Sequence, residues 1–277
     1  MPELPEVETV RTAMDDALRG ALISRLWQSG KTMRWPIPPR LDEMITGCRI
    51  SNLERRGKYI LMRLDNAMTL ILHLGMSGSI RLHDQPPPHR RHDHLVLDCM
   101  TTADRRCLAI LNDPRRFGGC QLVASETADS HPLLKKMGPE PFANTVSGPW
   151  LAAQLANRRT SIKAALLDQQ LIAGIGNIYA SEALFEAAIS PRRLACNLGL
   201  ARAERLVPAI RAVLQRAIRA GGTSLRDHVQ PGGEIGYFAQ QLQVYDRAGQ
   251  PCPRCRAPLQ LLRQAGRASF YCGGCQR

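Results

Sequence analysis

Cys252-Pro-Arg-Cys255 and Cys272-Gly-Gly-Cys275 dominate the last part of the sequence, with sixteen residues between the two pairs. This spacing is typical of a tetrahedral Zn2+ site on two facing turns, because both thiolates of a short C-x2-C pair can reach the same ion. The stretch between the pairs has the length of one hairpin, in which residues 259–262 run into Arg263-Gln-Ala-Gly266 and residues 268–271 return. The sequence therefore predicts a structural zinc ribbon.

Two disulfides are the alternative use of these four cysteines. The total of 9 cysteines is odd, the other five are scattered without a pattern, and no secretory signal precedes them. Such usage is typical of a reducing cytoplasm, where disulfides are rare. We therefore expect one structural Zn2+ and a cytoplasmic protein. Because four thiolates complete the coordination shell, we expect no catalytic metal. The scattered cysteines are Cys48, Cys99, Cys107, Cys120 and Cys196.

The positive charge of the chain is unevenly placed. The 277 residues include 37 Lys+Arg and 24 Asp+Glu, a formal net charge of +13. Residues 1–149 hold 20 basic and 17 acidic side chains, whereas residues 150–277 hold 17 and 7, so the second segment carries +10 of the +13. A polyanion such as nucleic acid is the natural partner of this segment, through neutralisation of phosphates. Charge alone leaves open a basic protein with another role. No apolar run is long enough for a membrane span, and no targeting segment is visible.

The first half of the chain combines one helix with many short strands. Residues 5–19 carry apolar side chains at helical spacing, with Pro5 in the first turn and Gly20 as a stop signal. From about residue 22 to 123 the pattern changes to short apolar runs broken by turn residues, which is typical of an antiparallel sandwich or barrel. Asp65-Asn66 is the expected hairpin turn between two of these runs. The clearest runs are 59–64, 68–74, 94–98 and 107–111.

The second half is helical until the zinc ribbon. Helical patterns extend from residue 150 to about 220, where Gly221-Gly222 ends them and a Gly-rich stretch follows. The expected architecture is an α+β multidomain protein. Its three parts are an N-terminal β-sandwich domain over residues 1–135, a helical domain over 136–240 and a zinc module over 241–277.

Six short motifs occur in order along the chain. They are Pro2-Glu-Leu-Pro-Glu6, Arg56-Gly-Lys58-Tyr, His73-Leu-Gly-Met76-Ser-Gly, Asp113-Pro-Arg115-Arg-Phe117-Gly, Gly174-Ile-Gly-Asn177-Ile-Tyr-Ala and Gly266-Arg267 through Cys275-Gln276. With these motifs, residues 2–276 resemble the bacterial formamidopyrimidine-DNA glycosylases (the Fpg/MutM family), and the order of six makes coincidence an implausible explanation. The start reads Pro-Glu-Leu-Pro-Glu, whereas the related endonuclease VIII enzymes usually begin Pro-Glu-Gly-Pro-Glu.

The resemblance implies a bifunctional DNA glycosylase and apurinic/apyrimidinic lyase of base excision repair. Such an enzyme excises 8-oxoguanine and formamidopyrimidines from damaged double-stranded DNA and cuts both flanking phosphates by β,δ-elimination. It also implies that the helical part contains a helix–two-turn–helix element. We expect a monomer that associates with the nucleoid when it acts on DNA. Two alternatives remain open at this point: an endonuclease VIII-like specificity for oxidised pyrimidines, and a zinc-ribbon DNA-binding protein without enzymatic activity.

The expected catalytic residues begin at the N-terminus. Removal of Met1 would leave Pro2 with a secondary α-amine, whose reference pKa near 8 keeps far more of it neutral at pH 7 than of a lysine. Attack of this amine on a sugar C1′ gives an iminium cation that promotes elimination. Pro2 and Glu3 read equally as an ordinary helix start, where acidic residues are stabilised by the helix dipole. The resemblance makes Pro2 the nucleophile, Glu3 the general acid, Glu6 its support and Lys58 a proton-transfer group.

The expected DNA contacts lie in several turns. By resemblance, Met76, Arg115 and Phe117 fill the hole that a flipped nucleotide leaves, and their Gly-rich surroundings predict exposed tips rather than core positions. Arg267 is expected to grip DNA from the zinc hairpin and to assist the last elimination, although an exposed hairpin arginine is usually without a specific role. The other expected phosphate contacts are His73, His92, Arg158, Lys163 and Asn177.

Three further expectations concern details of these segments. Asn177 is expected at the N-cap of a helix, where first-turn N–H groups point at a phosphate, although a simple helix–turn–helix corner has the same pattern. Arg55 and Arg56 are expected to face phosphates or solvent. Residues 223–234 resemble, more loosely, the loop that covers the flipped base.

Overall fold

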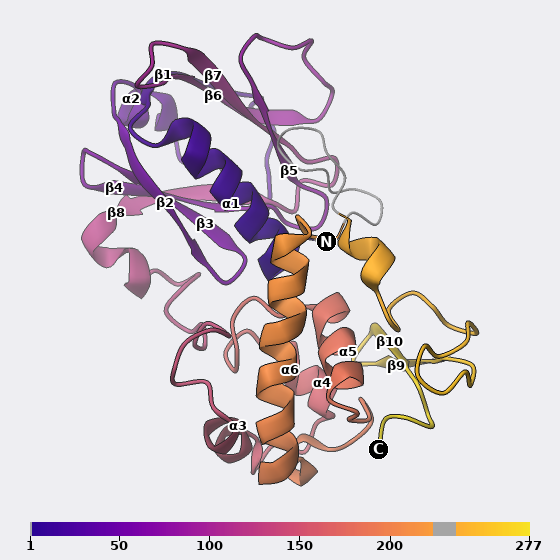
Figure 1. Ribbon diagram of the computed structural model, residues 1–277. Coiled ribbons are helices and arrows are strands. Elements are labelled where there is room, and N and C mark those ends of the chain that lie inside the picture. Colours follow the sequence, from indigo (N-terminus) through magenta and orange to yellow (C-terminus); the bar gives the residue numbers. More distant parts are fainter. Residues whose placement is uncertain (1, 224–236) are drawn as a thin grey trace. The chain divides into compact units, whose positions relative to one another are not determined.

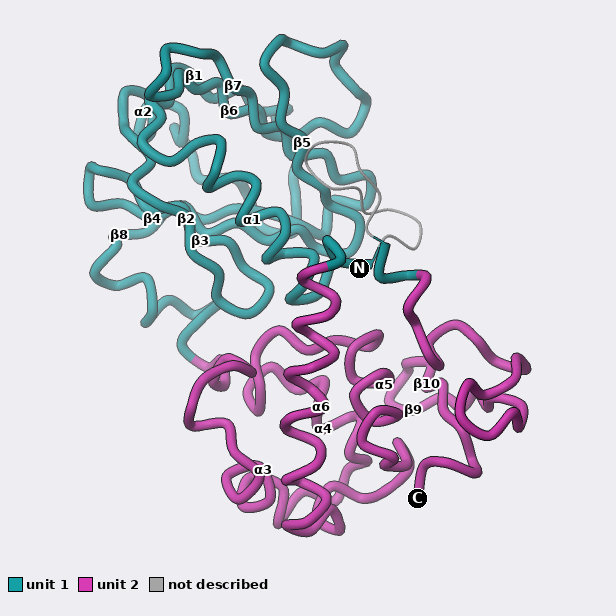
Figure 2. The backbone as a smooth tube through the Cα atoms, in the orientation of Figure 1, with its two compact units in different colours: residues 1–135, 220–239 teal, residues 136–219, 240–277 magenta. Residues whose placement is uncertain are grey.

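The structure, a computed structural model, describes residues 2–223 and 237–277 and separates them into two units. Unit 1 comprises residues 1–135 and 220–239, and unit 2 comprises residues 136–219 and 240–277 (Figure 2). Each unit is described by itself below.

Helix α1 (Leu4–Leu18) opens unit 1 and has the amphipathic pattern that the sequence predicts. Val7, Val10 and Met14 are almost fully buried, because their spacing places them on one face of the helix. The chain leaves the helix through Gly20, which has φ +77°, and the Gly20 N–H donates to the carbonyl of Ile50 at 2.7 Å. The helix is thereby tied to the first strand of one sheet.

Two four-stranded antiparallel sheets form the rest of unit 1, as the strand-like runs predict (Figure 1). The turn between β3 (Tyr59–Leu64) and β4 (Met68–His73) spans residues 65–67, and Ala67 adopts φ +60° there. One sheet has the order β1 (Leu22–Gln28), β6 (Asp93–Met100), β7 (Arg106–Asn112), β5 (Ser79–His83), and the other has the order β2 (Ile50–Arg56), β3 (Tyr59–Leu64), β4 (Met68–His73), β8 (Gly119–Ala124). The short helices α2 (Leu41–Ile45) and η1 (Ser125–Ser130) complete the unit.

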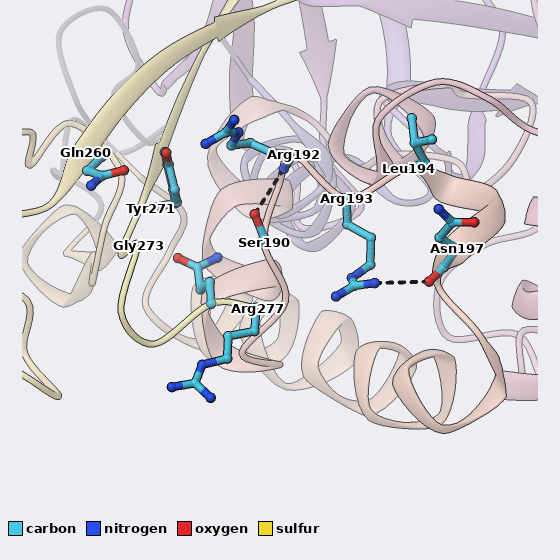
Figure 3. A pocket seen from close by; sticks show the side chains of 10 residues that line it. Ser190, Arg192, Arg193, Leu194, Asn197, Gln260, Tyr271, Gly273 and Arg277 are labelled. Carbon is cyan, nitrogen blue, oxygen red and sulfur yellow. Dashed lines mark hydrogen bonds between the residues drawn. The ribbon is translucent and has the colours of Figure 1, made fainter.

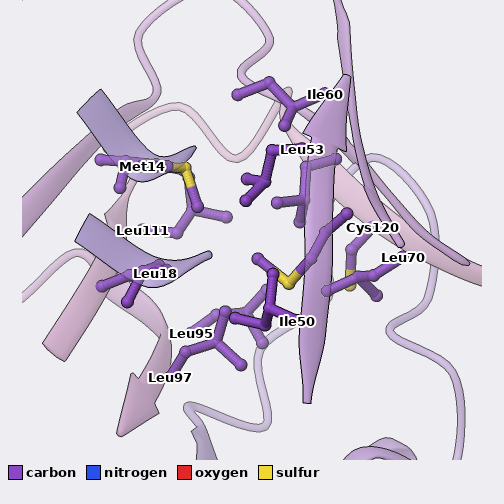
Figure 4. Packing of buried hydrophobic residues seen from close by; sticks show 14 of the residues in the cluster. Met14, Leu18, Ile50, Leu53, Ile60, Leu70, Leu95, Leu97, Leu111 and Cys120 are labelled. Atoms are coloured by element: carbon purple, nitrogen blue, oxygen red, sulfur yellow. The ribbon is translucent and has the colours of Figure 1, made fainter. Parts of the chain in front are cut away.

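The core of unit 1 is one apolar cluster to which α1 and both sheets contribute (Figure 4). Met14 and Leu18 of α1 lie in the same cluster as Ile60 of one sheet and Leu97 of the other. Full burial of such side chains contributes about 1.5–3 kcal/mol each. The cluster therefore fixes α1, and with it the residues at the start of the chain, against the sandwich.

Unit 2 contains four α-helices and a two-stranded sheet. In the described residues, α5 (Asn177–Glu186) and α6 (Leu200–Arg219) pack on each other, and α3 (Gly148–Leu155) packs against α6. The elements are α3 (Gly148–Leu155), α4 (Ile162–Leu166), α5 (Asn177–Glu186), η2 (Ala195–Asn197), α6 (Leu200–Arg219), β9 (Gln260–Gln264) and β10 (Arg267–Tyr271), and η3 (Phe238–Gln241) lies at the boundary between the units.

The zinc hairpin is docked on α5. Glu182 is almost fully buried, and its carboxylate accepts the backbone N–H groups of Gln243, Val244 and Tyr245 at 2.9–3.0 Å. Burial raises the pKa of Glu182, while these three N–H groups act in the opposite direction. A small apolar cluster joins Phe185 of α5 to Phe270 of β10. The helical part and the hairpin are therefore packed against each other within unit 2.

The predicted fold class is confirmed: an antiparallel sandwich with an N-terminal helix precedes a helical part and a hairpin with four cysteines. The division into three domains at residues 136 and 241 stays a prediction. Within the described ranges, no helix combines the length and apolar character that crossing a bilayer requires.

Candidate catalytic and nucleic-acid-binding sites

The N-terminal segment of unit 1 places two buried carboxyl groups beside Pro2. Pro2 directly precedes α1 and is buried, and Glu3 and Glu6 are each 1% exposed. Glu3 is the N-cap of the helix and forms a reciprocal capping box with Glu6. In this box the Glu3 N–H donates to Glu6 Oε2 at 2.8 Å. The box holds the Glu3 side chain in one orientation, next in sequence to Pro2.

Glu6 also binds a segment that is distant in sequence. Its Oε1 accepts the backbone N–H of Thr223 at 2.7 Å. Gly222 has φ +80°, and a Cβ at this position would lie 3.1 Å from Glu6 Cγ and Oε1. A side chain at residue 222 would therefore be strained and crowded against the carboxylate. The sequence-predicted covering loop, residues 223–234, lies outside the described residues apart from Thr223.

Lys58 lies in the turn between β2 and β3. Gly57 adopts φ +56° in this turn, and Arg56 pairs with Tyr59 across it. Arg55 does not face solvent or phosphate, contrary to the expectation from sequence. Its Nε donates to Glu8 Oε2 at 2.7 Å and its Nη1 donates to the carbonyl of Gly57 at 3.1 Å. Arg55 therefore ties the turn that carries Lys58 to α1.

Two loops of unit 1 carry the residues expected to fill the DNA stack, and buried Asp113 joins them. Asp113 Oδ1 accepts the Ser77 hydroxyl at 2.6 Å, and Asp113 Oδ2 accepts the Gly118 N–H at 2.7 Å. Its backbone carbonyl is 3.0 Å from His94 Nε2. Neither Asp113 nor Ser77 was singled out from the sequence. The signal was present, because an Asp that follows an apolar strand and precedes Pro is typical of a side chain that orders a turn.

The tips of these loops form an open pocket in unit 1. Phe117 is 42% exposed, and the Arg115 guanidinium lies over its ring at 4.8 Å from the centroid. Met76 and Arg34 line the same pocket. The expectation that Met76 and Phe117 lie outside the core agrees with this geometry. Their insertion into DNA stays a prediction.

His73 is largely buried behind the loops. Its ring lies 4.8 Å from Tyr59 and 6.0 Å from Trp35, centroid to centroid, and its Nδ1 accepts the Gly75 N–H at 3.0 Å. Burial, together with the nearby charges of Arg34 and Lys58, lowers the pKa of His73 to about 4. A neutral His73 therefore orders the loop that carries Met76. A phosphate contact by His73 is untested.

His92 reaches the second loop through its backbone. Its carbonyl accepts the N–H of Asp113 at 2.9 Å, and its side chain is half-buried. The structure thus links His92 to the loop of Arg115 and Phe117. A phosphate contact by the His92 ring stays a prediction.

The four terminal cysteines of unit 2 form a site that fits one Zn2+. Their Sγ atoms all lie within 4.8 Å of one another, with 3.9 Å between Cys252 and Cys275 and 3.4 Å between Cys255 and Cys272. A tetrahedron with Zn–S bonds of about 2.3 Å has edges of about 3.8 Å, whereas a disulfide requires about 2.05 Å. All nine cysteines are free thiols, so the disulfide alternative is wrong.

The turns of this site support thiolate ligands. The backbone N–H of Arg254 donates to Cys252 Sγ, and that of Cys275 donates to Cys272 Sγ, each at 3.4 Å. Between the pairs, Ala265 and Gly266 have φ values of +47° and +74°, which a two-residue type I′ turn requires. The predicted zinc hairpin is confirmed, and four cysteines complete its coordination shell.

Arg267 follows this turn, and the next residue is held by two side chains of the helical part. The Ala268 carbonyl accepts Lys163 Nζ at 2.6 Å and Asn177 Nδ2 at 3.0 Å. Lys163 is only 1% exposed and also donates to Ser269 Oγ at 2.9 Å. The expected role of Lys163 as a phosphate contact is therefore corrected. Its ammonium lies inside unit 2 and positions the strand next to exposed Arg267.

The position of Asn177 also differs from the one that the sequence predicts, because its side chain does not cap α5. The N-cap of α5 is Gly176, in extended conformation, and Asn177 is the first residue of the helix. The side-chain amide of Asn177 binds the hairpin carbonyl rather than the first turn of its own helix. A glycine N-cap is tolerated nearly as well as a polar one. A DNA contact by the Asn177 side chain stays a prediction.

Gln169 shapes the Gly-rich turn before α5, which the sequence did not indicate. Its Oε1 accepts the Gly174 N–H and its Nε2 donates to the Ile175 carbonyl, both at 2.8 Å. Gly174 has φ +86°. Arg158 forms an ion pair with Asp168 at 2.6 Å and remains one-third exposed. The phosphate contact expected of Arg158 is not tested by this pairing.

Family models match three segments of the chain. Residues 1–120 match the formamidopyrimidine-DNA glycosylase N-terminal domain, and residues 137–229 match the formamidopyrimidine-DNA glycosylase H2TH domain. Residues 249–277 match the zinc finger found in FPG and IleRS.

Full-length relatives and solved structures agree with these matches. Formamidopyrimidine-DNA glycosylases from Cereibacter sphaeroides and Azorhizobium caulinodans are 51% and 49% identical, with 100% of both chains covered. The crystal structure of MutM (Fpg) from Thermus thermophilus is 38% identical with a TM-score of 0.86 over 99% of this chain and 98% of that one. Wild-type Lactococcus lactis Fpg, in complex with DNA containing N7-benzyl-Fapy-dG, is 33% identical with a TM-score of 0.89 over 100% of both chains.

Proposed function

The chain belongs to the formamidopyrimidine-DNA glycosylase family, and from this premise we propose that Pro2 is the nucleophile of a bifunctional glycosylase and lyase. The protein is a DNA glycosylase for oxidised purines and binds damaged double-stranded DNA. The L. lactis relative has been captured with DNA containing an abasic site and with DNA containing Fapy-dG. The proposed substrates of this chain are accordingly 8-oxoguanine and formamidopyrimidines.

The first step is a displacement at the sugar. Once Met1 is removed, the neutral Pro2 amine attacks C1′, the N–C1′ bond forms, and the glycosidic bond to the damaged base breaks. The proton that the amine loses passes to the departing base. Glu3 donates a proton to the ring oxygen, so that the sugar opens and a cationic iminium remains on Pro2. Because the proline nitrogen then carries no hydrogen, the iminium keeps its positive charge.

The later steps are two eliminations. The iminium acidifies the C2′ proton; its removal expels the 3′ phosphate, and a second elimination expels the 5′ phosphate. Lys58 transfers protons in these steps, and Arg267 assists the last one.

The observation that carries this mechanism is the arrangement at the start of α1. Buried Glu3 and Glu6 are linked by the capping box, and Glu6 is bonded to Thr223. A buried carboxyl group next in sequence to Pro2 supplies the proton donor that glycosidic chemistry at this amine requires. This supports an enzyme over the non-enzymatic alternative, and the names of the full-length relatives favour oxidised purines over oxidised pyrimidines.

Duplex recognition is assigned to both units. Phe117 and Met76 fill the space of the extruded nucleotide, and Arg115 donates hydrogen bonds to the orphaned cytosine. In unit 2, the bound Zn2+ fixes the fold of the hairpin, and Arg267 contacts the DNA backbone from it. We assign His73, His92, Arg158 and Asn177 to phosphate contacts.

The organisation in the cell is proposed as well. The three domains comprise residues 1–135, 136–240 and 241–277. The net charge of +13 supports association with nucleoid DNA in the cytoplasm. The enzyme is proposed to act as a monomer, which sedimentation equilibrium at micromolar concentration tests.

Borohydride trapping tests the nucleophile. Protein with a free Pro2 amine is mixed with duplex DNA containing 8-oxoguanine opposite cytosine, and reduction of the iminium should give a covalent adduct. The matched control carries one extra residue before Pro2, and a second control carries the same extension at the C-terminus. We expect the adduct only with the wild type and the C-terminal extension, and DNA binding with all three. Normal excision by the N-terminally extended protein would exclude Pro2 as the nucleophile.

A further inference from the structure

A second basic pocket lies within unit 2, at the opposite end of the hairpin from Arg267. It is an open cavity of about 720 Å3 between residues 190–197, the base of the hairpin and the C-terminal residues. Figure 3 shows the Arg192 side chain on the Tyr271 side of the pocket, and Arg193 extending from the same segment toward Asn197. Arg277 enters from the C-terminal segment.

Basic side chains line this pocket without an acidic side chain beside them. Three guanidinium groups line it, those of Arg192, Arg193 and Arg277, and no Asp or Glu side chain is among the lining residues. In the part of the chain that the structure describes, the side chains of Arg192 and Arg277 form no ion pair or hydrogen bond. The carbonyl of Arg277 is occupied, because it accepts the Ser190 N–H at 3.3 Å. Two partly exposed arginines elsewhere in unit 2 do have acidic partners, as Arg158 has Asp168 and Arg216 has Glu186.

Arg193 lines the pocket with a guanidinium that is only partly satisfied. Its Nη1 donates to the Asn197 carbonyl at 3.3 Å, but its Nε is buried and has no partner among the described residues. An unpaired buried N–H costs about 1–3 kcal/mol, and more in a charged group, so this arginine is not held by strong contacts within the protein. Burial and the neighbouring Arg202 lower the pKa of Arg193, which is consistent with an excess of positive charge here.

The remaining lining groups suit oxygen-rich anions. Tyr271 and Gln260 pair with each other across the two strands and both face the pocket. A phosphate group offers several acceptor oxygens at once, and arginine side chains bind it by parallel N–H···O bonds. A carboxylate ligand would leave most of these donors without a partner.

The pocket is distinct from the expected contact of Arg267. Arg267 and Tyr271 stand at opposite ends of β10, and four residues of extended strand span about 13 Å. One phosphate cannot contact both. We propose that Arg192, Arg193 and Arg277 form a second phosphate-binding site, separate from the lesion-processing site. Its ligand is a phosphate group, either of a DNA backbone or of a small phosphorylated molecule.

The test compares a pocket variant with a matched surface variant in the zinc-loaded protein. Arg192→Gln/Arg277→Gln removes two charges from the pocket, and the control, Arg205→Gln, removes an exposed arginine of α6 outside it. Calorimetric titration with inorganic pyrophosphate measures the small-ligand affinity. Binding of undamaged duplex DNA at several salt concentrations measures phosphate contacts, since the slope of log K against log salt is negative and each lost contact reduces its magnitude by about 0.9.

The two sources of phosphate give different results. Pyrophosphate binding that weakens about tenfold or more in the pocket variant, but not in Arg205→Gln, supports a site for small phosphorylated molecules. A DNA backbone contact is supported if pyrophosphate binding is unchanged and the slope of log K against log salt is shallower in the pocket variant than in Arg205→Gln. If both measurements match Arg205→Gln, the proposal is wrong. Zinc content and thermal unfolding verify the fold, and Arg277→Gln alone replaces the double variant if that variant loses zinc. Borohydride trapping of Pro2 is not affected by any of these outcomes.

Discussion

His73 should make the folded protein less stable as the pH falls below neutrality. Burial, then the charges of Arg34 and Lys58, lower the pKa of this imidazole from 6.5 to about 4. In the unfolded chain its pKa returns to about 6.5, so the unfolded state binds a proton between these two values and the folded state does not. The contribution of neutral His73 to the free energy of unfolding is therefore fully present above pH 6.5 and is lost as the pH falls toward 4. A shift of this size corresponds to about 3 kcal/mol.

The substitution His73→Asn removes the titration and keeps the loop contact. The Asn side-chain oxygen can accept the Gly75 N–H that His73 Nδ1 accepts at 3.0 Å. Urea unfolding is followed by tryptophan fluorescence between pH 7.5 and 4, because Trp35 lies 6.0 Å from His73 and reports on this region. The wild-type stability should fall more steeply than that of His73→Asn, by up to about 1.4 kcal/mol per pH unit.

The comparison isolates one histidine. Burial also lowers the pKa values of two other histidines, His83 and His94. These histidines and the zinc cysteines are present in both proteins, so their contributions to the pH dependence cancel in the difference. Parallel curves for the wild type and His73→Asn across this range would refute the argument that His73 is held neutral.

Three other substitutions or treatments address the loops and the hairpin. Ser77→Ala should lower the free energy of unfolding by about 1–3 kcal/mol, and Asp113→Asn should lower it by at least as much. In a double-mutant cycle measured by urea unfolding, the coupling between the two should exceed about 1 kcal/mol; additive effects would show that the 2.6 Å contact has no energetic role. Lys163→Met should keep its zinc but bind duplex DNA with an abasic site about tenfold more weakly, because one charge-assisted bond to the Ala268 carbonyl is lost. The control in this fluorescence anisotropy titration is Lys136→Met, a change at an exposed lysine. Chelation of the zinc should abolish DNA binding in the same assay and, as a consequence, iminium formation on the DNA; normal binding by chelated protein would contradict the role given to the hairpin.

Local signals account for the parts of the fold that the sequence predicted. The apolar residues of helix α1 follow the helical spacing. The terminal cysteines have the spacing of metal ligands, and the hairpin turn lies between them in the same short segment. Residues within one such element are at most about twenty positions apart. Periodicity and turn chemistry can therefore specify them without knowledge of the rest of the chain.

The corrected expectations share a different cause, namely a partner far away in sequence. Lys163 binds a carbonyl 105 residues away, Asn177 binds the same carbonyl 91 residues away, and Arg55 binds Glu8 across 47 residues. Each of these side chains was assigned a role from its local surroundings, as a phosphate contact, a cap or a surface charge. A buried polar group is satisfied by whichever partner the tertiary fold supplies, and a single sequence does not contain that information.

The zinc hairpin shows why such long-range partners are needed for function. An isolated two-stranded hairpin is marginally stable in water, and the four cysteines of this one lie at its base, whereas Arg267 lies at its tip. Zinc alone therefore fixes the end of the hairpin that is farther from the expected DNA contact. Lys163 and Asn177 hold the carbonyl immediately after Arg267, so they supply the constraint that the metal cannot supply at that distance. Loss of the metal and loss of the Lys163 ammonium should accordingly weaken DNA binding in separate ways: the first by unfolding the module, the second by loosening one arginine in a folded one.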